Sequence, residues 1–177
     1  MKRSTTIKLT CSALCVALAM VLPLVTGHIP TIGKALSPMH IPVMLCGFVC
    51  GWPWGLVVGF VSPLLRSLLF GFPAILPGGV AMAFELATYG AVSGLLYKVL
   101  PKKVPYLYVS LLVSMVAGRV VWGIARFFIA GLQHGSFPFS AFLAGAVTNA
   151  VPGIVLHIFL IPPLVLALRR AKLIQIE

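Results

Sequence analysis

Long apolar runs separated by short polar or turn-forming segments dominate this chain. A membrane-spanning helix needs roughly 20 apolar residues to cross about 30 Å of hydrocarbon, and most of these runs approach that length. We expect an all-α membrane protein with residues 1–177 in a single integral membrane domain, because no long linker divides the runs. The pattern predicts six helices, the second and third short, at 7–26, 38–51, 54–71, 78–99, 105–131 and 138–168.

Two segments allow a second interpretation. Pro42 and the corner at 51–54 blur the division between the second and third runs. Residues 38–71 therefore fit either two short spans or one span with a re-entrant piece. The first run has the basic start of a signal peptide, but no A-x-A-like cleavage site follows it and no lipobox precedes Cys11 or Cys15. We therefore expect this run to remain as the first helix.

Composition supports the membrane assignment. Hydrophobic residues make up 60% of the chain and charged residues 8%, against about 45–50% and about 25% in an ordinary soluble domain. A soluble globular protein and a disordered tail are thereby excluded. The net charge of +11 does not indicate a nucleic-acid partner, because too little polar surface is available to present a basic face. Two i, i+4 cysteine pairs, Cys11/Cys15 and Cys46/Cys50, are interpreted as packing residues rather than as a metal site.

The positions of the cations predict the topology. Cations gather in the short cytoplasmic loops of membrane proteins. Nine of them fall at the chain ends or between the fourth and fifth runs, whereas the three opposite loops contain only Lys34. An even number of spans, with both termini cytoplasmic, places all nine on one side. The nine are Lys2, Arg3, Lys8, Lys98, Lys102, Lys103, Arg169, Arg170 and Lys172.

A few polar residues remain inside the apolar runs, where ionisable groups are costly and usually functional. Helical rise places three of them, Arg66, Glu85 and Arg126, roughly 8–10 Å below the outer surface. It places Arg119 and Asn149 deeper, at roughly 16–18 Å, and His157 in the inner half. We interpret His157 as a packing residue.

Helical spacing suggests how these groups meet. Arg119, Trp122 and Arg126 share one face of the fifth helix, and Asn149 shares a face of the sixth with Phe142. Arg66 and Glu85 flank a short loop at matching depth, so we expect them to form an ion pair. That pairing would leave Arg119 and Arg126 uncompensated, in a cavity that favours an anionic solute. The same arginines can also snorkel to headgroups, and Asn149 can join two helices by a hydrogen bond.

The outer loops and the missing motifs complete this picture. The segments 27–38, 71–79 and 131–138 are apolar, aromatic and rich in turn formers, which suits a lid over a pocket. His40 lies near the outer loops, where it can contact a solute. The sequence has no ATP-binding G-x-x-x-x-G-K-[ST] motif and no carboxylate pair. We therefore expect no enzyme, no cofactor and no metal, and any uphill transport needs energy from a partner.

Several strings resemble the substrate-binding S components of energy-coupling factor (ECF) vitamin transporters. The resemblance covers nearly the whole chain and rests on Ser37–Val43 (SPMHIPV), Gly47–Gly51, Ala81–Gly90 (AMAFELATYG), Gly118–Gly123 (GRVVWG) and Thr148–Gly153. It implies a six-helix S component in a bacterial cell membrane that binds a vitamin near the outer face. Its implied partners are a transmembrane coupling subunit (T component) and two ATPase subunits. The family's A-x-x-x-A contact with the coupling subunit matches Ala13 and Ala17, and its mechanism is a toppling of the S component in the membrane.

The solute is less constrained than the family. The strings look closest to pantothenate-type or related small-vitamin members, and the surplus of arginines suits a carboxylate. The candidate substrate-binding residues are Arg119, Trp122, Arg126, Asn149, Arg66, Glu85 and His40. Pyridoxine-type vitamins, folate and cobalamin remain alternatives, as do a membrane enzyme built on Glu85 and His157 and a structural subunit that binds no solute.

Overall fold

The computed structural model describes residues 3–25, 37–148 and 150–171, and these are almost entirely helical. They contain no β-strand, as the apolar pattern predicts. The helices begin and end close to the predicted limits. In chain order they are α1 (Arg3–Val25), α3 (His40–Cys50), α4 (Trp52–Phe70), the π-turn η1 (Ile75–Gly79), α5 (Val80–Val99), α6 (Val104–Leu132), α7 (Phe139–Leu143), η2 (Ala144–Thr148) and α8 (Val151–Arg170).

Five of the described helical segments are long and apolar enough to cross a membrane. They correspond to the first, third, fourth, fifth and sixth predicted spans, and the π-turn η1 extends the fourth at its N-terminal end. Proline marks where several begin, since a helix tolerates proline in its first turn. Pro53, Pro105 and Pro152 each lie in the first turn of α4, α6 and α8.

The second predicted span is the short helix α3. Its 11 residues rise only about 16 Å, about half of the hydrocarbon thickness. α3 ends at Gly51, whose φ of 94° is open mainly to glycine, and α4 begins at the next residue. Residues 38–71 thus form two separate helices, of which only α4 is long enough to span.

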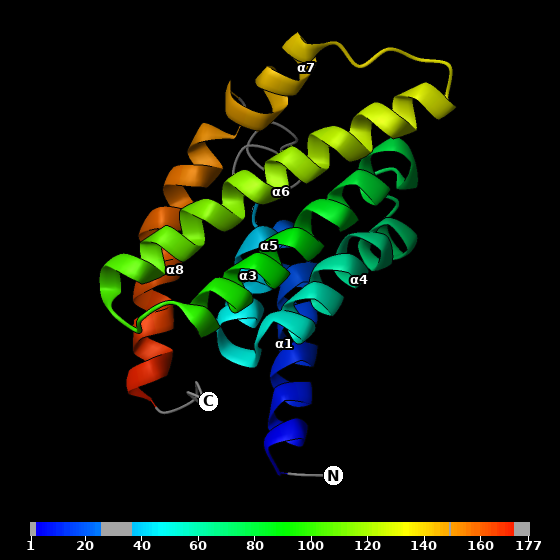
Figure 1. Ribbon diagram of the computed structural model, residues 1–177. Helices are drawn as coiled ribbons and strands as arrows, with labels where there is room; N and C mark the ends of the chain where they lie inside the picture. Colours follow the sequence, from blue (N-terminus) through cyan, green and yellow to red (C-terminus); the bar gives the residue numbers. More distant parts are fainter. Residues whose placement is uncertain (1–2, 26–36, 149, 172–177) are drawn as a thin grey trace.

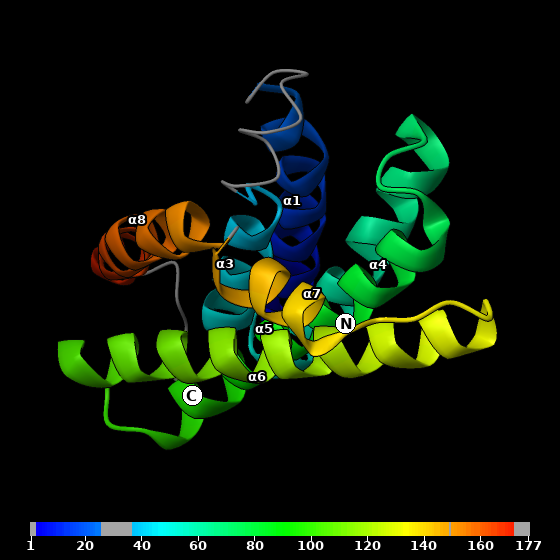
Figure 2. The same ribbon diagram turned by 90° about the horizontal axis from the view of Figure 1, so that it is seen from above.

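α3 lies at the centre of the helix bundle. Figure 1 shows α4 and α8 on opposite sides of the molecule, with α3 and α5 between them, and the view from above in Figure 2 agrees. α6 runs across one face of this arrangement. Most of α3 is buried, including Val43, Met44 and Cys46, which are fully covered. The cysteine pair of α1 packs against the same core as Cys46 and Cys50, which supports their interpretation as packing residues.

Glycines allow α3, α4 and α5 to approach closely. An added Cβ at Gly90 would lie 2.2 Å from the carbonyl oxygen of Gly55, and one at Gly47 would lie 2.4 Å from that of Gly90. Such separations are far inside van der Waals contact, so these three positions admit no side chain. The small-residue spacing in the sequence predicts this kind of backbone approach.

The last predicted span is interrupted. We expected one helix over 138–168, but the structure has α7, the π-turn η2 and then α8, which begins at Val151. Pro152 explains why a helix begins anew there, since it lies in the first turn of α8 and has no backbone N–H to donate. Asn149 lies outside the described residues, so the expectation that it shares a helix face with Phe142 stays a prediction.

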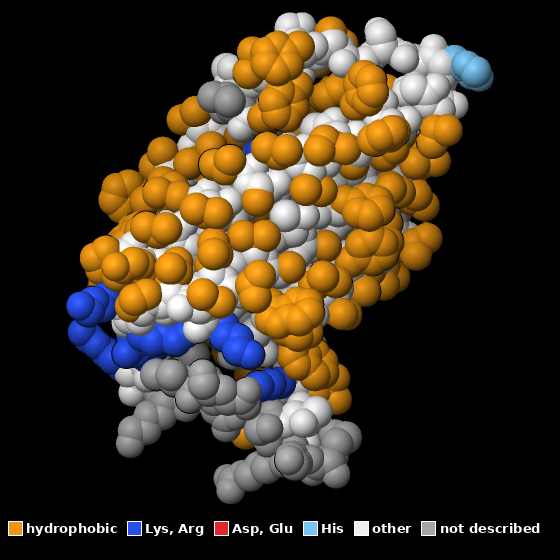
Figure 3. Space-filling model, in the orientation of Figure 1, with side chains coloured by type: hydrophobic (Ala, Val, Ile, Leu, Met, Phe, Trp, Pro, Cys, Tyr) orange, Lys and Arg blue, Asp and Glu red, His pale blue; other side chains and the backbone are white. Residues whose placement is uncertain are grey.

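One end of the molecule is basic. Figure 3 shows most of the visible Lys and Arg side chains gathered at the end where α1 begins and α8 ends, below a surface that is mostly apolar. Arg169 Nη1 donates a 2.6 Å hydrogen bond to the carbonyl oxygen of Lys102, which joins the end of α8 to the α5–α6 loop. The Lys102 ammonium lies over the ring of Tyr97 and donates a hydrogen bond to the backbone carbonyl oxygen of Tyr97. Burial and the nearby Arg169 charge lower the pKa of Lys102.

Candidate functional site

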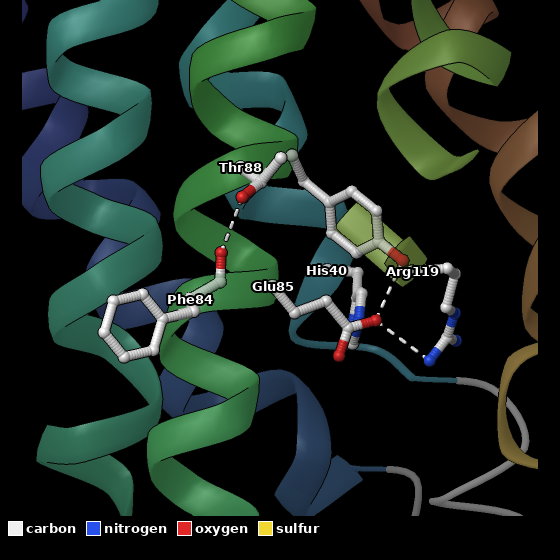
Figure 4. A network of polar contacts seen from close by, with 6 residues as sticks. His40, Phe84, Glu85, Thr88 and Arg119 are labelled. Carbon is white, nitrogen blue, oxygen red and sulfur yellow. Dashed lines mark hydrogen bonds and ion pairs between the residues drawn. The ribbon is translucent and has the colours of Figure 1, made fainter. Parts of the chain in front are cut away.

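Glu85 is the centre of a buried polar cluster. Its side chain is 1% exposed, and Arg119 Nη1 lies 2.9 Å from its Oε1 atom. The hydroxyl of Tyr89, one turn further along α5, donates a 2.8 Å hydrogen bond to the same oxygen. His40 Nε2 lies 3.5 Å away. Figure 4 shows these side chains converging from α3, α5 and α6.

The expected ion pair between Arg66 and Glu85 is wrong. Arg66 Nη1 instead donates a 2.9 Å hydrogen bond to the carbonyl oxygen of Met20 on α1, and its guanidinium lies 5.2 Å from the ring centre of Phe70. Glu85 therefore neutralises Arg119, and the prediction that Arg119 is uncompensated is wrong as well. Depth counting misled here, because α6 has 29 residues, about 44 Å of helix, and a helix longer than the bilayer must tilt or protrude.

His157 is the residue of this cluster that sequence reasoning missed. Its ring stacks on that of His40, with centroids 5.8 Å apart and planes at 22°. The prediction treated residues 138–168 as one helix and so placed His157 in the inner half, as a packing residue. The available signal was Pro152, which indicates a new helix start and puts His157 in the second turn of α8. We call His40, Glu85, Tyr89, Arg119 and His157 the polar centre.

The predicted face of α6 continues outward from the polar centre into aromatic rings. The Arg119 guanidinium lies 6.0 Å from the ring centre of Trp122. Trp122 in turn contacts Phe137 edge-on at 5.8 Å and stacks near Phe142 at 6.3 Å. We call Trp122, Phe137 and Phe142 the aromatic cluster. The 131–138 loop and α7 therefore pack against α6 through these rings.

Arg126 lies beside the aromatic cluster, with its guanidinium 5.4 Å from the ring centre of Phe137. Its Nε atom is buried and has no hydrogen-bond partner among the described residues. Neither Arg66 nor Arg119 is in this position, since each has a carbonyl or carboxylate oxygen as acceptor. Of the three arginines inside the predicted spans, Arg126 is thus the one with a buried nitrogen that has no hydrogen-bond acceptor among the described residues.

These groups are suited to binding rather than to covalent chemistry. The one carboxylate is already held by Arg119 and Tyr89. Within the described ranges, no group of three or more His, Cys, Asp or Glu side chains could hold a metal ion. What the arrangement offers is a guanidinium, imidazole nitrogens and aromatic faces next to one another.

The fold and this site define a helical membrane protein with a polar centre enclosed by its spans. The model of the family described as "ECF transporter, substrate-specific component" matches residues 7–165, and the chain belongs to this family. The resemblance noted in the sequence is thereby confirmed. Comparisons with curated proteins and with solved structures returned no match.

Family membership fixes the general role of the chain. It is a multi-pass membrane protein and the substrate-specific subunit of an ECF transporter, a family of transporter subunits rather than enzymes. The family implies a small-molecule substrate and association with a T component and ATPase subunits. This agrees with the lack of an ATP-binding motif in the sequence.

Proposed function

We propose that this chain captures a small water-soluble vitamin at the outer side of a bacterial cell membrane. The observation that carries the proposal is Arg126, a partly buried guanidinium whose Nε has no acceptor among the described residues. Arginine binds carboxylates through two parallel hydrogen bonds, and these are strongest where water is excluded. A solute with an acidic group would complete the hydrogen bonding of Arg126.

The surroundings of Arg126 support a binding pocket. The aromatic cluster lies against it and provides the apolar walls that small-molecule sites usually have. The segment carrying Phe142 packs closely on α6, since an added Cβ at Gly123 would lie 2.4 Å from the Phe142 ring. In this proposal Trp122 and Arg126 contact the solute, whereas Arg119 acts through its pairing with Glu85.

Pantothenate is our first candidate for the solute. It joins a carboxylate, which suits Arg126, to hydroxyl and amide groups, which suit the polar centre. Pyridoxine-type vitamins, folate and cobalamin are the alternatives. His40 and Asn149 remain candidate contacts; Asn149 lies outside the described residues.

Binding can be measured on the purified chain in detergent by Trp fluorescence and thermal shift. We expect pantothenate to quench Trp122 and to raise the unfolding temperature, whereas its alcohol analogue, which lacks the carboxylate, binds more weakly. Arg126→Gln should weaken pantothenate binding roughly 10- to 100-fold, the range expected for one charge-assisted hydrogen bond. The affinity of Arg126→Lys for pantothenate should lie between those of wild type and Arg126→Gln, because lysine keeps the charge but loses the planar guanidinium.

Two controls separate binding from secondary effects. Trp122→Phe should remove the fluorescence response but keep the thermal shift, whereas Trp52→Phe, at the Gly51 turn where α4 begins, should change neither. A folded wild-type protein that responds to none of the four vitamins would refute vitamin capture and favour a structural subunit.

We further propose that α1 contacts the T component through Ala13 and Ala17. Both residues are exposed on the described structure, and α1 is the least buried of the long helices. Two small residues four positions apart let another helix approach closely. An ATP-driven complex of this kind supplies the energy that the chain itself cannot.

This contact predicts a separation of binding from uptake. Ala13→Leu and Ala17→Leu should leave vitamin affinity unchanged in the isolated chain but reduce uptake by the full transporter, because leucine holds the helices apart. Leu14→Ala, at an exposed neighbouring position, is the matched control and should retain uptake. Full uptake by both leucine variants would exclude this face as the contact.

A further inference from the structure

The stacked pair His40 and His157 contains buried polar atoms without a hydrogen-bond partner among the described residues. The two residues are 2% and 3% exposed. Neither ring nitrogen of either residue makes a hydrogen bond within the described part of the chain. The backbone of Ser37 interacts with the His157 side chain. Unpaired polar atoms are costly inside a membrane, where no bulk water can satisfy them.

Packing alone does not account for these imidazoles. A phenyl ring would fill nearly the same volume without any nitrogen to desolvate, and an aromatic ring already lies beside His40. Tyr89 lies 5.2 Å from His40, ring centre to ring centre. Buried polar groups without partners in a protein indicate an occupant such as a ligand or water.

The neighbours of His40 indicate what kind of group is missing. Glu85 Oε1 is 3.5 Å from Nε2 of His40, so in the tautomer with its proton on Nε2 the N–H faces this carboxylate. The Nδ1 atom then carries a lone pair and accepts a hydrogen bond. His157, when neutral, likewise offers one donor and one acceptor. A hydroxyl matches such a pair, because it donates and accepts at once, and an amide does so through its N–H and C=O.

We propose that the His40–His157 pair binds an uncharged hydroxyl or amide group of the transported solute. This inference rests on the proposed function and makes it more specific. The substrate is then an acid that carries a second hydrogen-bonding group, with Arg126 binding the acid and the two histidines binding the hydroxyl or amide. Arg119 serves as a positioning residue, since it holds Glu85, which in turn faces Nε2 of His40.

The test uses the full chain, purified in detergent, and Trp122 fluorescence. His157→Phe and His40→Phe keep an aromatic ring but remove both nitrogens. We expect each to raise the Kd for pantothenate about 10-fold or more, since a solute hydroxyl or amide is then buried without a partner. The unfolding temperature without ligand should not fall, because the unpaired nitrogens are gone. His157→Gln, which restores a donor and an acceptor, should recover part of the affinity.

A pantothenate analogue without its hydroxyl groups provides a second comparison. If the histidines bind a hydroxyl, wild type and His157→Phe should bind this analogue with similar affinity. The loss of affinity caused by the variant and the loss caused by removing the hydroxyl groups are then not additive. If the losses add fully and His157→Gln gives no recovery, the histidines do not contact the solute and the inference is wrong.

The outcomes distinguish this inference from the proposed function. Unchanged pantothenate affinity in both phenylalanine variants, with Trp122 still quenched, overturns the role of the histidines but leaves vitamin capture intact. If wild type binds pyridoxine, folate or cobalamin instead, the same variants are measured with that vitamin under the same criterion. A folded wild type that binds none of the four overturns the proposed function, and this inference with it. Should a phenylalanine variant not fold, His157→Leu and His40→Gln are compared in the same way.

Discussion

Glu85 neutralises one of the three arginines inside the predicted spans, Arg119. It is the only acidic residue within the predicted spans, and its carboxylate is bound by Arg119 and Tyr89. Removing one partner of a buried ion pair leaves the other charge without compensation. The polar centre is therefore a point where one substitution affects the stability of the whole bundle.

A double-mutant cycle tests this pairing. Glu85→Gln and Arg119→Met should each destabilise the fold by about 3–5 kcal/mol, because each leaves one charge buried and unpaired. The double variant should be much less destabilised than the sum of the two, and thermal unfolding in detergent measures all three. Additive losses would mean that the two side chains do not interact in the protein.

At the scale of single residues, the sequence predicts which residues are candidates for the site better than it predicts which of them contact each other. Arg119, Trp122 and Arg126 lie along one face of a helix, so a 3.6-residue period suffices to group them. The partner of Glu85 depends on the tilt and register of α5 against α6, which no local pattern encodes. Gly118, for example, packs directly on the Tyr89 ring, where an added Cβ would lie 2.3 Å from a ring carbon.

Among the helices, backbone contact rather than large side chains joins α3, α4 and α5. In a bilayer, helix association depends on van der Waals packing, because lipid tails are as apolar as the side chains. Gly47, Gly55 and Gly90 provide this close contact. Any side chain at these positions must push two helices apart.

Gly90→Ala should therefore destabilise the protein by about 1–3 kcal/mol, the usual effect of overpacking. Its control is Gly131→Ala, which also lies in a long helix, α6, but has nothing within 4 Å of the added Cβ. That change should be neutral or stabilising by at most about 1 kcal/mol, through helix propensity. Equal losses for the two variants, measured by thermal unfolding, would contradict the close approach of α4 and α5.

Helix positions followed from the apolar pattern to within a few residues, with two exceptions. α3 is shorter than a span because the other helices, not lipid, surround it, so its apolar length did not have to match the bilayer. The last span is broken near Pro152, and a continuous apolar run conceals such a break. Both exceptions lie next to the polar centre, where His40 begins α3 and His157 follows the break.

For the whole molecule, most of the described basic residues near the start of α1, the end of α8 and the α5–α6 loop lie at one end. We propose that this end faces the cytoplasm. The basic residues near this end of the chain's helices include Lys8, Lys98, Lys103, Arg169 and Arg170.

Single cysteines in a variant with all four native cysteines replaced by alanine test this topology. His134→Cys, in the exposed loop after α6, should react with a membrane-impermeant maleimide in intact cells. Lys103→Cys should react only after the membrane is permeabilised. The reverse labelling pattern would invert the orientation, and labelling of both positions in intact cells would mean an even number of crossings between them, so that α6 does not span.

The charge at the basic end also has an electrical consequence. A cell whose interior is negative attracts each positive charge with about 2.3 kcal/mol per 100 mV of full displacement across the membrane. With the basic end inside, lifting several lysines and arginines toward the outer leaflet would require work against that voltage. A rotation that brings the polar centre toward the cytoplasm must therefore turn about the basic end, which the voltage anchors at the inner leaflet.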